Sequence, residues 1–414
     1  MMRMWNWLKP GLGLKRWISM TLVGGVVLAL GLSGFFDEYL PELTGLGLRA
    51  YVLTLLGLLL IGLALLGLIF SLVSKIYTDS VPLVQKLQRR SRLQSGPSIV
   101  AIGGGTGLST FLRGLKEYTV NLTAVVAVTD DGGSSGRLRD DFDLPAPGDL
   151  RNCLVALAPE EQRLSELFTY RFSGESELAG HSLGNILLTA LSDIHGGFPE
   201  AIRACSEVLA IQGRVLPAML GHPELRATMS DDSQYVGETN ITSAGKQIES
   251  LEVVPQPARP NPEAISAVAD ADLIVVGPGS LYTSILTNFL EPKLCSAVCQ
   301  ADAPVVYICN LMTQAGETGD YRVSDHLEAF KEIPPQPVVF DHILVNTRQA
   351  PREIREEYEA EGARQVQFDY DVVKKYDLKI HAQNFIEVDE HIRHDVGAVV
   401  ERLEGIVNFQ GGAG

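Results

Sequence analysis

An apolar run that stops at three glycines constrains the fold of this chain more than any other stretch. Ile99–Ile102 is followed by Gly103, Gly104 and Gly105, and leucines at helical spacing come after Gly107. This order predicts a strand, a tight glycine turn and a helix. Such a turn lets the backbone approach a ligand closely and points free helix N–H groups at it, which favours a phosphate. We therefore expect an anion-binding turn made by Gly103, Gly104, Gly105, Thr106 and Gly107, the alternative being a tight turn without a ligand.

The spacing of these glycines argues against two common nucleotide sites. A nicotinamide fingerprint spaces its glycines as G-x-G-x-x-G, whereas here Gly103, Gly105 and Gly107 alternate. The lysine of a P-loop is also absent from this turn. The turn therefore indicates a phosphate group without naming the cofactor.

A second polar loop follows the next predicted strand, Thr123–Val128. It opens with Asp130 and Asp131, which point opposite ways on an extended strand end, so one of them is expected to face the cleft. That carboxylate could accept from a sugar hydroxyl, bind Mg²⁺ or act as a base, or it could cap the turn. Arg137 or Arg139 is expected to pair with a phosphate and the other with a surface carboxylate. The donors of this loop are Gly132, Gly133, Ser134 and Ser135.

Two further groups place polar side chains at a turn before an apolar helix. One contains Asp149 and Asn152, and the other contains His181 and Asn185. Ser182 is expected to cap the second helix. His181 could carry a proton, donate to a ligand or make a structural bond. Asn185, one turn into an apolar helix, needs a partner, which could be ligand or backbone.

A fourth group follows a buried strand and repeats the strand, glycine turn and helix pattern. It predicts a second anion or ribose site. Asn310 ends the next strand, with further polar, glycine-bearing residues behind it. Polar loops at the ends of several parallel strands meet at one edge of the sheet, where ligands bind. The candidates in this fourth group are Gly277, Gly279, Ser280 and Thr283.

From Gly96 onward the chain alternates apolar strands and amphipathic helices. This alternation predicts one α/β domain, residues 96–414, with a Rossmann-like parallel sheet covered by helices on both faces. Polar–apolar alternation over Arg226–Glu238 predicts a hairpin on the flank of the sheet. The expected strands are Ile99–Ile102, Thr123–Val128, Leu273–Val276, Val305–Cys309 and His342–Val345, and the expected helices include Leu108–Glu117, Leu183–Ile194, Pro199–Leu209, Ser280–Phe289, Val323–Phe330 and Arg352–Glu361.

Residues 1–95 are expected to form a membrane hairpin and a linker. Trp17–Phe36 and Tyr51–Val73 carry no charges, and each is long enough to cross a bilayer as a helix. Basic residues flank the outer ends of this pair, and the loop between the runs holds Asp37, Glu38 and Glu42 against Arg49. This asymmetry predicts a two-span protein of the cell membrane with both termini in the cytoplasm.

The charge balance and the cysteines limit the partners. A net charge of −16 argues against a nucleic-acid surface, which would be basic. Five scattered cysteines form no pair-of-pairs metal set and are typical of free thiols in a reducing compartment. No cofactor is predicted with certainty, and Mg²⁺ at Asp130 is the metal candidate.

These motifs together resemble the CofD/YvcK superfamily, and the match is closest to its gluconeogenesis factor branch. The resemblance rests on the joint order of motifs that span most of residues 98–395. These are Gly103–Ser109, Asp130–Arg139, Gly148–Leu154, Gly180–Leu188, Gly277–Ser284 and Ile308–Thr318, followed by Ser324–Leu327. It implies a Rossmann-like core with a ligand cleft at the strand ends. A membrane hairpin is a departure from many members of this family.

The resemblance also implies a function. One branch transfers a phospholactyl group from a nucleoside-diphosphate donor to a deazaflavin. The branch that this chain is similar to is associated with cell shape, envelope synthesis and growth on gluconeogenic carbon, and its members bind UDP-sugars, notably UDP-N-acetylglucosamine. By motif, its late tyrosine and arginine correspond to Tyr358 and Arg393.

Two hypotheses follow from the sequence. The first is a membrane-anchored, non-catalytic regulator that binds a UDP-N-acetylglucosamine-like nucleotide sugar. The second is a phospholactyl-type transferase in which Asp130 or Asp131 is the catalytic candidate. A nicotinamide oxidoreductase is a poorer third. The expected partners are the nucleotide sugar and the membrane, with self-association and an envelope-synthesis protein as further candidates.

Overall fold

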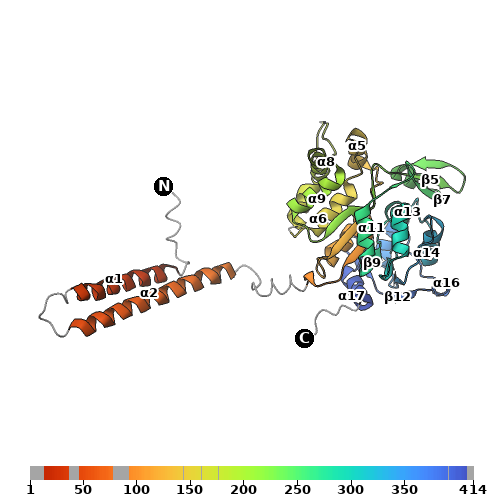
Figure 1. Cartoon of the computed structure of the whole chain (residues 1–414). Helices are drawn as coiled ribbons and strands as arrows, with labels where there is room; N and C mark the ends of the chain where they lie inside the picture. Colours follow the sequence, from red (N-terminus) through yellow and green to blue (C-terminus); the bar gives the residue numbers. More distant parts are fainter. Residues whose placement is uncertain are drawn as a thin grey trace. The chain divides into compact units, whose positions relative to one another are not determined.

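The computed structural model describes most of the chain as two compact units. The described residues are 14–36, 46–77, 93–142, 144–159, 161–175, 177–389 and 391–407. They fall within Met1–Arg90 and Ser91–Gly414, the two parts drawn in Figure 1.

A seven-stranded parallel sheet forms the centre of the larger unit. Its order is β12-β11-β10-β9-β1-β2-β3. The register places Ile102 opposite Val125 on one side and Val276 on the other. The strands are β1 Ile99–Gly103, β2 Leu122–Val126, β3 Arg214–Pro217, β9 Leu273–Val276, β10 Val305–Ile308, β11 His342–Asn346 and β12 Lys379–Gln383. The predicted parallel α/β sheet is therefore confirmed.

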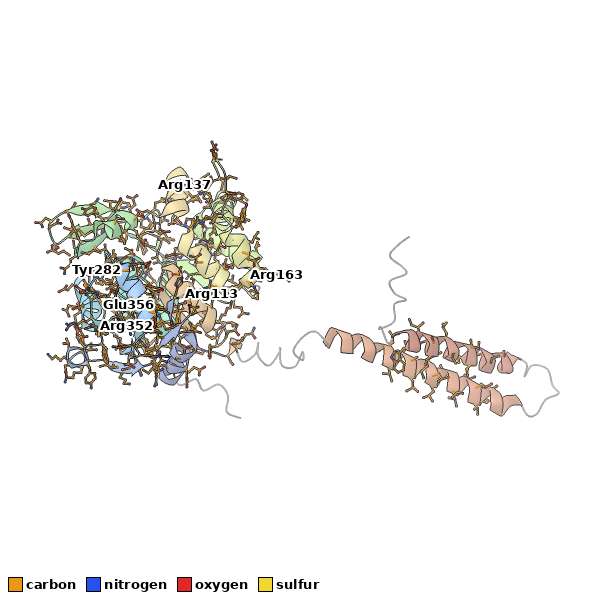
Figure 2. The ribbon with its side chains drawn as sticks, turned by 180° about the vertical axis from the view of Figure 1, so that it is seen from behind. Arg113, Arg137, Arg163, Tyr282, Arg352 and Glu356 are labelled. Carbon is orange, nitrogen blue, oxygen red and sulfur yellow. The ribbon has the colours of Figure 1, made fainter. Side chains whose placement is uncertain are left out.

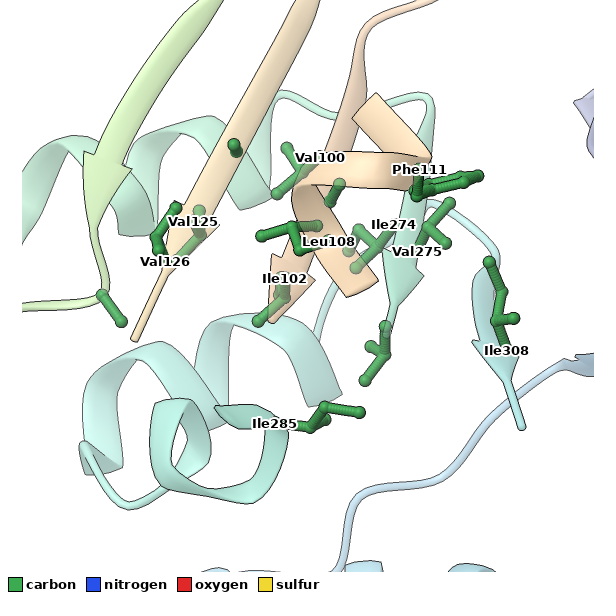
Figure 3. Packing of buried hydrophobic residues seen from close by; sticks show 14 of the residues in the cluster. Val100, Ile102, Leu108, Phe111, Val125, Val126, Ile274, Val275, Ile285 and Ile308 are labelled. Atoms are coloured by element: carbon green, nitrogen blue, oxygen red, sulfur yellow. The ribbon is translucent and has the colours of Figure 1, made fainter. Parts of the chain in front are cut away.

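The inner strands are buried from end to end. Every residue of β1, β2, β9 and β10 is buried, as expected when helices cover both faces of a parallel sheet. Figure 3 shows Leu108 and Phe111 packed with Ile102 and Ile274 in one hydrophobic cluster. The alternation of polar and apolar residues that is typical of half-exposed strands is absent here, because neither face of the sheet is exposed to water.

Helices cover both faces because the chain adds β2 and β3 on one side of β1 and later adds β9 to β12 on the other side. The crossovers from β1 to β3 contain α4 Gly105–Leu115 and α6 Gly148–Leu157, which pack against each other. The crossovers from β9 to β11 run the opposite way, so right-handed connections put their helices on the other face. Those helices include α13 Pro292–Cys299 and α14 Val323–Glu332, and α17 Val396–Val407 returns to pack on α4.

The predicted flanking hairpin is confirmed and is part of a three-stranded antiparallel sheet. β5 Glu224–Met229 pairs with β6 Gln234–Val236 and with β7 Ile248–Val254. The helix α10 Glu238–Ala244 lies between β6 and β7 along the chain. In Figure 1 β5 and β7 project from the side of the larger unit.

The remaining elements of the larger unit are short or connect these layers. They are α5 Gly133–Phe142, α7 Glu161–Thr169, α8 Leu183–His195, α9 Phe198–Leu209, β4 Met219–Leu220, β8 Arg259–Pro260, α11 Pro262–Ala269, α12 Thr287–Phe289, α15 Arg352–Ala360, α16 Tyr370–Val373, β13 Ile386–Val388 and β14 Ile392–His394.

Three local predictions differ from the structure. Most of the polar loop after β2 is helical, because α5 begins at Gly133. The helix expected over Ser280–Phe289 begins as a π-helix, Leu281–Leu286, and continues as α12. The edge strands β3 and β12 were not expected, because β3 is only four residues long and exposed residues interrupt the apolar pattern of β12.

The smaller unit contains two helices, α1 Leu14–Phe36 and α2 Leu46–Tyr77, which pack closely through glycines. A Cβ at Gly24 would lie 2.9 Å from Ile61 Cγ1, and one at Gly57 would lie 2.7 Å from the Leu28 backbone nitrogen. Among the described residues, one helix, Ala50–Ile69 within α2, is long and apolar enough to cross a membrane, and the apolar part of α1, Trp17–Ser33, is shorter. The prediction of two full spans is therefore not supported.

Candidate functional site

The two predicted glycine turns lie side by side at the point where the strand order reverses. β1 pairs with β2 on one side and with β9 on the other, and the chain winds outward from this pair in both directions. The turns at Gly103–Gly107 and Gly277–Ser280 follow the carboxyl ends of β1 and β9. In open α/β sheets the crevice at such a switch point is where ligands bind.

Close contact between the turns requires glycine on both sides. A Cβ at Gly107 would lie 2.8 Å from the carbonyl oxygen of Pro278, and one at Gly279 would lie 3.0 Å from that of Gly104. Gly105, with φ +67°, also adopts a backbone conformation that other residues rarely take. The glycines therefore serve the packing of the two turns as well as the approach of a ligand.

A cavity of about 820 Å³ opens at these turns. Its size is within the range of small-molecule and cofactor sites. The helix α4 begins at one end of it, and the residue before the helix, Gly104, has no side chain of its own to cap it. The sequence-predicted residues that line the cavity are Gly105, Thr106, Gly107, Gly279, Ser280, Asn310, Tyr358 and Arg393.

Tyr358 and Arg393, carried over by resemblance alone, lie together in the wall of this cavity. The hydroxyl of Tyr358 accepts from the backbone N–H of Ile392 at 3.3 Å, which ties α15 to β14. Arg393 pairs with Asp389 at 3.2 Å and is half exposed. The same wall includes Arg113, a cavity residue that sequence reasoning missed because it lies within a predicted helix and not in a loop at a strand end.

The second turn differs from the prediction in one respect. The π-helix that follows it is already capped by a carboxylate, because Glu317 accepts from the Tyr282 N–H at 3.1 Å and from the Thr283 hydroxyl at 2.8 Å. Glu317 is buried, and burial raises its pKa. An anion at the start of that helix would meet this carboxylate, and the anion or ribose site expected at this turn stays a prediction. Thr283 serves Glu317.

The first turn also meets a carboxylate, from α6. Asp149 Oδ2 accepts from the Gly105 N–H at 2.5 Å. Burial raises the pKa of Asp149 to about 6, against the lowering effect of the Gly105 N–H, and Asp130 raises it further. Asp149 therefore holds the turn through Gly105 without lining the cavity, while Thr106 and Gly107 of the same turn do line it.

The adjacent aspartates have different partners. Asp131 Oδ1 accepts from the backbone N–H of Thr239 at 2.9 Å and from its hydroxyl at 2.7 Å, so this carboxylate anchors α10. Asp130 Oδ1 accepts from the Gly132 N–H at 2.8 Å. Among the described residues no group of three or more His, Cys, Asp or Glu is arranged to hold a metal ion. The prediction of Mg²⁺ at Asp130 therefore gains no further ligands.

Glu238, at the start of α10, is a candidate that sequence reasoning missed. Burial, together with Asp130, Asp149 and Glu317, raises its pKa to about 8. The four carboxylates come from four different parts of the chain, and the other three all act on Glu238. No local sequence signal marks Glu238, because it ends the predicted hairpin like an ordinary surface residue.

The third predicted group lies around a buried arginine and outside the cavity. Arg151 Nη1 donates to Ser182 Oγ at 2.6 Å and to Asn185 Oδ1 at 2.9 Å, and its Nη2 donates to Asn152 Oδ1 at 2.9 Å. The side chain of Asn185 thus has a side-chain partner, where ligand or backbone was expected. Ser182 caps α8 as predicted, because its hydroxyl accepts from the Asn185 N–H. His181 is buried beside this group.

The other candidates have structural surroundings or lie outside the described side chains. Gly103 and Gly277 sit at strand ends, and Gly277 has φ +83°. Ser135 is buried under α6, where a Cβ at Gly148 would lie 2.6 Å from its hydroxyl. The side chain of Ser134 is outside the described part of the chain. Residues that do not line the cavity are Gly103, Gly104, Asp130, Asp131, Gly132, Gly133, Ser135, Arg137, Asp149, Asn152, His181, Asn185, Gly277 and Thr283.

The amino-acid sequence of this chain is similar to those of known proteins. A family model described as 2-phospho-L-lactate transferase CofD matches residues 99–386. The chain is similar to a Nostoc sp. protein named "Putative gluconeogenesis factor", with 41% identity over 99% of this chain and 93% of the relative. It is also similar to the gluconeogenesis factor of Bacillus subtilis, with 45% identity over 74% of this chain and 97% of the relative.

A solved structure shares the fold of the larger unit. A crystal structure of a protein from Bacillus halodurans matches with a TM-score of 0.71 and 44% identity, and it covers 74% of this chain and 99% of that chain. The Bacillus relatives thus leave about a quarter of this chain unmatched, whereas the Nostoc relative matches nearly all of it.

Proposed function

This chain belongs to the 2-phospho-L-lactate transferase CofD family, with relatives named gluconeogenesis factor, and on that premise we propose that its cavity binds a UDP-sugar of the UDP-N-acetylglucosamine kind. The observation that carries the proposal is the cavity of about 820 Å³ at the β1–β9 switch point, with a glycine turn at one side and Tyr358 and Arg393 in its wall.

The glycine turn suits the diphosphate. Gly105, Thr106 and Gly107 form the first residues of α4, where the helix dipole favours an anion. The Gly105 N–H donates to Asp149, so the diphosphate would take the N–H groups of Thr106 and Gly107. Arg113 and Arg393 line the wall, and each is paired with a carboxylate, Glu161 and Asp389 respectively. A phosphate of the ligand would compete with these carboxylates for the two guanidinium groups.

The rest of the wall suits a sugar or base. Asn310 donates to the Gly279 carbonyl at 2.8 Å, and its buried Oδ1 has no partner among the described residues. An unpaired buried acceptor costs about 1–3 kcal/mol, which a ligand N–H or O–H would offset. Thr106, Ser280 and Gln314 supply further polar groups, and Met312 and Phe111 supply apolar surface.

Isothermal titration of the purified full-length chain in detergent tests the proposal. We expect UDP-N-acetylglucosamine to bind at least tenfold more tightly than UMP, since the sugar and second phosphate add contacts. No heat with the UDP-sugar at low salt would overturn the proposal. Tight binding of UMP alone would shift it to a nucleotide-monophosphate site.

A pair of matched arginines sharpens the test. Arg393 and Arg352 are both exposed and each pairs with a carboxylate four residues away, Asp389 and Glu356, but only Arg393 lines the cavity. Arg352 and Glu356 are labelled in Figure 2. We expect Arg393→Ala to weaken UDP-sugar binding at least tenfold and Arg352→Ala to change it less than twofold.

We further propose a regulatory role in growth on gluconeogenic carbon, envelope synthesis and cell shape, with the bound UDP-sugar reporting the level of an envelope precursor. The relatives named gluconeogenesis factor support the first of these. A host strain lacking the gene should grow poorly on a gluconeogenic carbon source. The wild-type gene and the Arg352→Ala variant should restore growth, and Arg393→Ala should not.

A membrane location is part of the proposal. The outward side chains of the helix pair are large and apolar, including Leu22 and Val26 of α1 and Leu55 and Leu66 of α2. Gly24, Gly31 and Gly57 face the partner helix. Close packing through small residues with an apolar exterior is typical of helices in a bilayer. We propose that both helices anchor the protein with its cavity in the cytoplasm.

A transferase activity is the second candidate, favoured by the description of the matching family model. The carboxylates of Asp130 and Glu238 would then lie near the acceptor. Incubation with a phospholactyl-type nucleoside-diphosphate donor and a deazaflavin distinguishes the two functions. Product formation would establish the transferase, and binding of the UDP-sugar without turnover would leave the regulator.

A further inference from the structure

Three arginines from three separate elements converge on one short turn, Ala179–Ser182, ahead of α8. Arg137 of α5 donates from Nη2 to the Ala179 carbonyl at 2.8 Å. Arg171, which follows α7, donates from Nη1 to the Gly180 carbonyl at 2.8 Å. Arg151 of α6 reaches the same turn through Ser182 Oγ. The turn is thus held between three guanidinium groups.

The turn is shaped to let these groups approach. Gly180 has φ +80°, and a Cβ there would lie 3.0 Å from Arg137 Nη2. Any larger residue would be strained and would push the guanidinium away. Arg151, only 7% exposed, supports the turn from inside the protein.

The positive charges of this cluster have no ion-pair partner among the described residues. Arg137, Arg151 and Arg171 take part in none of the salt bridges found there. Burial, with Arg171 adding to it, lowers the pKa of Arg151, so the like charges repel one another. The carboxylates that act on Arg151 are Asp149, from the same helix, and Asp130, which follows β2.

Unused donors remain at the surface. A guanidinium carries five N–H donors, and the described hydrogen bonds use one from Arg137 and one from Arg171, both of which are exposed. The planar fork of arginine matches the oxygens of a phosphate in paired hydrogen bonds. None of the three arginines lines the cavity at the glycine turns.

We propose that Arg137, Arg171 and the Ala179–Ser182 turn form a second anion subsite, which takes a phosphate or diphosphate group and is separate from the nucleotide-sugar cavity. Arg151 is a positioning residue that holds the turn through Ser182. An anion bound there would relieve the repulsion between the guanidinium groups. The subsite stands whether or not the cavity binds a UDP-sugar.

Titration of the full-length chain with inorganic diphosphate at low salt is the test. The double variant Arg137→Ala/Arg171→Ala should weaken diphosphate binding at least tenfold. Arg163→Ala is the matched control, an exposed arginine of α7 that Figure 2 shows well apart from Arg137, and it should change binding less than twofold. Added salt should weaken binding, since exposed charges are screened.

A second arm separates the two sites. With the cavity saturated by UDP-N-acetylglucosamine, diphosphate should still bind to the wild type, and the double variant should keep its affinity for the UDP-sugar. If the UDP-sugar does not bind at all, the diphosphate titration of the variants still decides the subsite. Diphosphate binding that is abolished by the UDP-sugar, or unchanged in the double variant, would overturn the proposal.

Folding of the variants is checked in parallel. Each variant should keep the thermal midpoint of the wild type within a few degrees. Should the double variant fail to fold, Arg137→Lys and Arg171→Lys keep the charge but lose the paired geometry. These two variants should bind diphosphate more weakly than the wild type, and unchanged affinity in both would overturn the subsite.

Discussion

A single methyl group decides whether the two glycine turns can touch. The Cβ of an alanine at position 107 would lie 2.8 Å from the Pro278 carbonyl oxygen, which is backbone and cannot rotate away. The turns at the ends of β1 and β9 would have to separate by a few tenths of an ångström. The cavity between α4 and the second turn would change shape with them.

We expect Gly107→Ala to lower UDP-sugar affinity at least tenfold and to reduce stability by about 1–3 kcal/mol through overpacking. Gly405→Ala in α17 is the control, because nothing lies within 4 Å of its Cβ position. It should leave binding unchanged and stability equal or slightly higher, since alanine favours a helix. Titration and thermal unfolding measure both, and unchanged affinity in Gly107→Ala would move the ligand away from this turn.

Asp149 makes the stability of the same turn depend on pH. Its pKa is raised by burial from 3.8 to about 6, so between these values the folded protein holds the proton that the unfolded chain releases. The stability contributed by the protonated form is complete below pH 3.8 and is lost as the pH rises to about 6. Above that, the buried anion costs on the order of 3 kcal/mol.

Asp149→Asn should remove this cost, because the amide oxygen can still accept from the Gly105 N–H. We expect the variant to be more stable than the wild type at pH 7.5 by about 1–3 kcal/mol. The difference should shrink as the pH falls from 6 toward 4. Urea unfolding at several pH values measures it, and a difference that does not vary with pH would argue against a buried carboxylate here.

At the scale of elements, α10 begins among several carboxylates. Asp131 anchors it through Thr239, and the charges of Asp130, Asp149 and Glu317 act on Glu238 in its first turn. Gly237 and Gly245, at the two ends of α10, both have positive φ. The first turn of the helix is thus bound by the carboxylate of Asp131, while the carboxylates near Glu238 would repel it once Glu238 is charged.

We expect the packed position of α10 to become less stable against local opening as Glu238 loses its proton. Burial raises the pKa of Glu238 from 4.5 to about 8, so the stability contributed by its protonated form is complete below pH 4.5 and falls as the pH rises to about 8. Hydrogen exchange of α10 amides should show Glu238→Gln increasingly better protected than the wild type over this range, with a constant difference above it.

The control for α10 is Glu249→Gln, an exposed residue of β7 in the neighbouring sheet. Its protection should match the wild type at every pH. Equal protection of α10 in the wild type and Glu238→Gln at pH 8 would show that Glu238 is solvated and that α10 is held by Asp131 alone.

At the scale of the whole molecule, the helix pair and the α/β unit have opposite surfaces. Large apolar side chains such as Leu22 and Leu66 face outward from the pair, whereas the α/β unit buries Val and Ile strands in one core. The Bacillus relatives match the chain without about a quarter of its length. The two units are therefore expected to separate when the chain is cut between them.

Deletion of residues 1–92 should release a protein that stays in solution after membranes are pelleted and still binds the UDP-sugar. The full-length chain should pellet and should need detergent for extraction. Retention of the deleted form in the pellet would place a second membrane contact on the α/β unit.

The basic residues at the outer ends of the two apolar runs predict that both termini lie in the cytoplasm. In a Cys299→Ala background, a cysteine placed between Asp37 and Arg49 should react with an impermeant thiol reagent in intact cells. A cysteine at Gln94 should react only after lysis. The reverse pattern would put the cavity outside the cell, away from any UDP-sugar pool, and would contradict the proposed function.

Local patterns carried much of this fold. Val and Ile runs predicted the inner strands of the parallel sheet, because residues buried on both faces leave no polar alternation. Glycines after Ile102 and Val276 predicted the two turns, since a strand must end where the backbone turns sharply. The edge strand β12 escaped prediction because exposed residues break its apolar run, and β3 because it is only four residues long and ends in a proline.

The partners of the site residues were decided by tertiary structure alone. Asp149 meets Gly105, and Glu317 meets the π-helix at Tyr282, although each pair is far apart in the sequence. Both contacts exist because strand order brings different loops to one edge of the sheet, and no local pattern encodes that order. The same packing pairs Asp131 with Thr239 and Asn185 with Arg151 through hydrogen bonds. It also brings three arginines within hydrogen-bond distance of the Ala179–Ser182 turn. Residue type and spacing are local properties, whereas burial and charge partners arise only when the chain has folded.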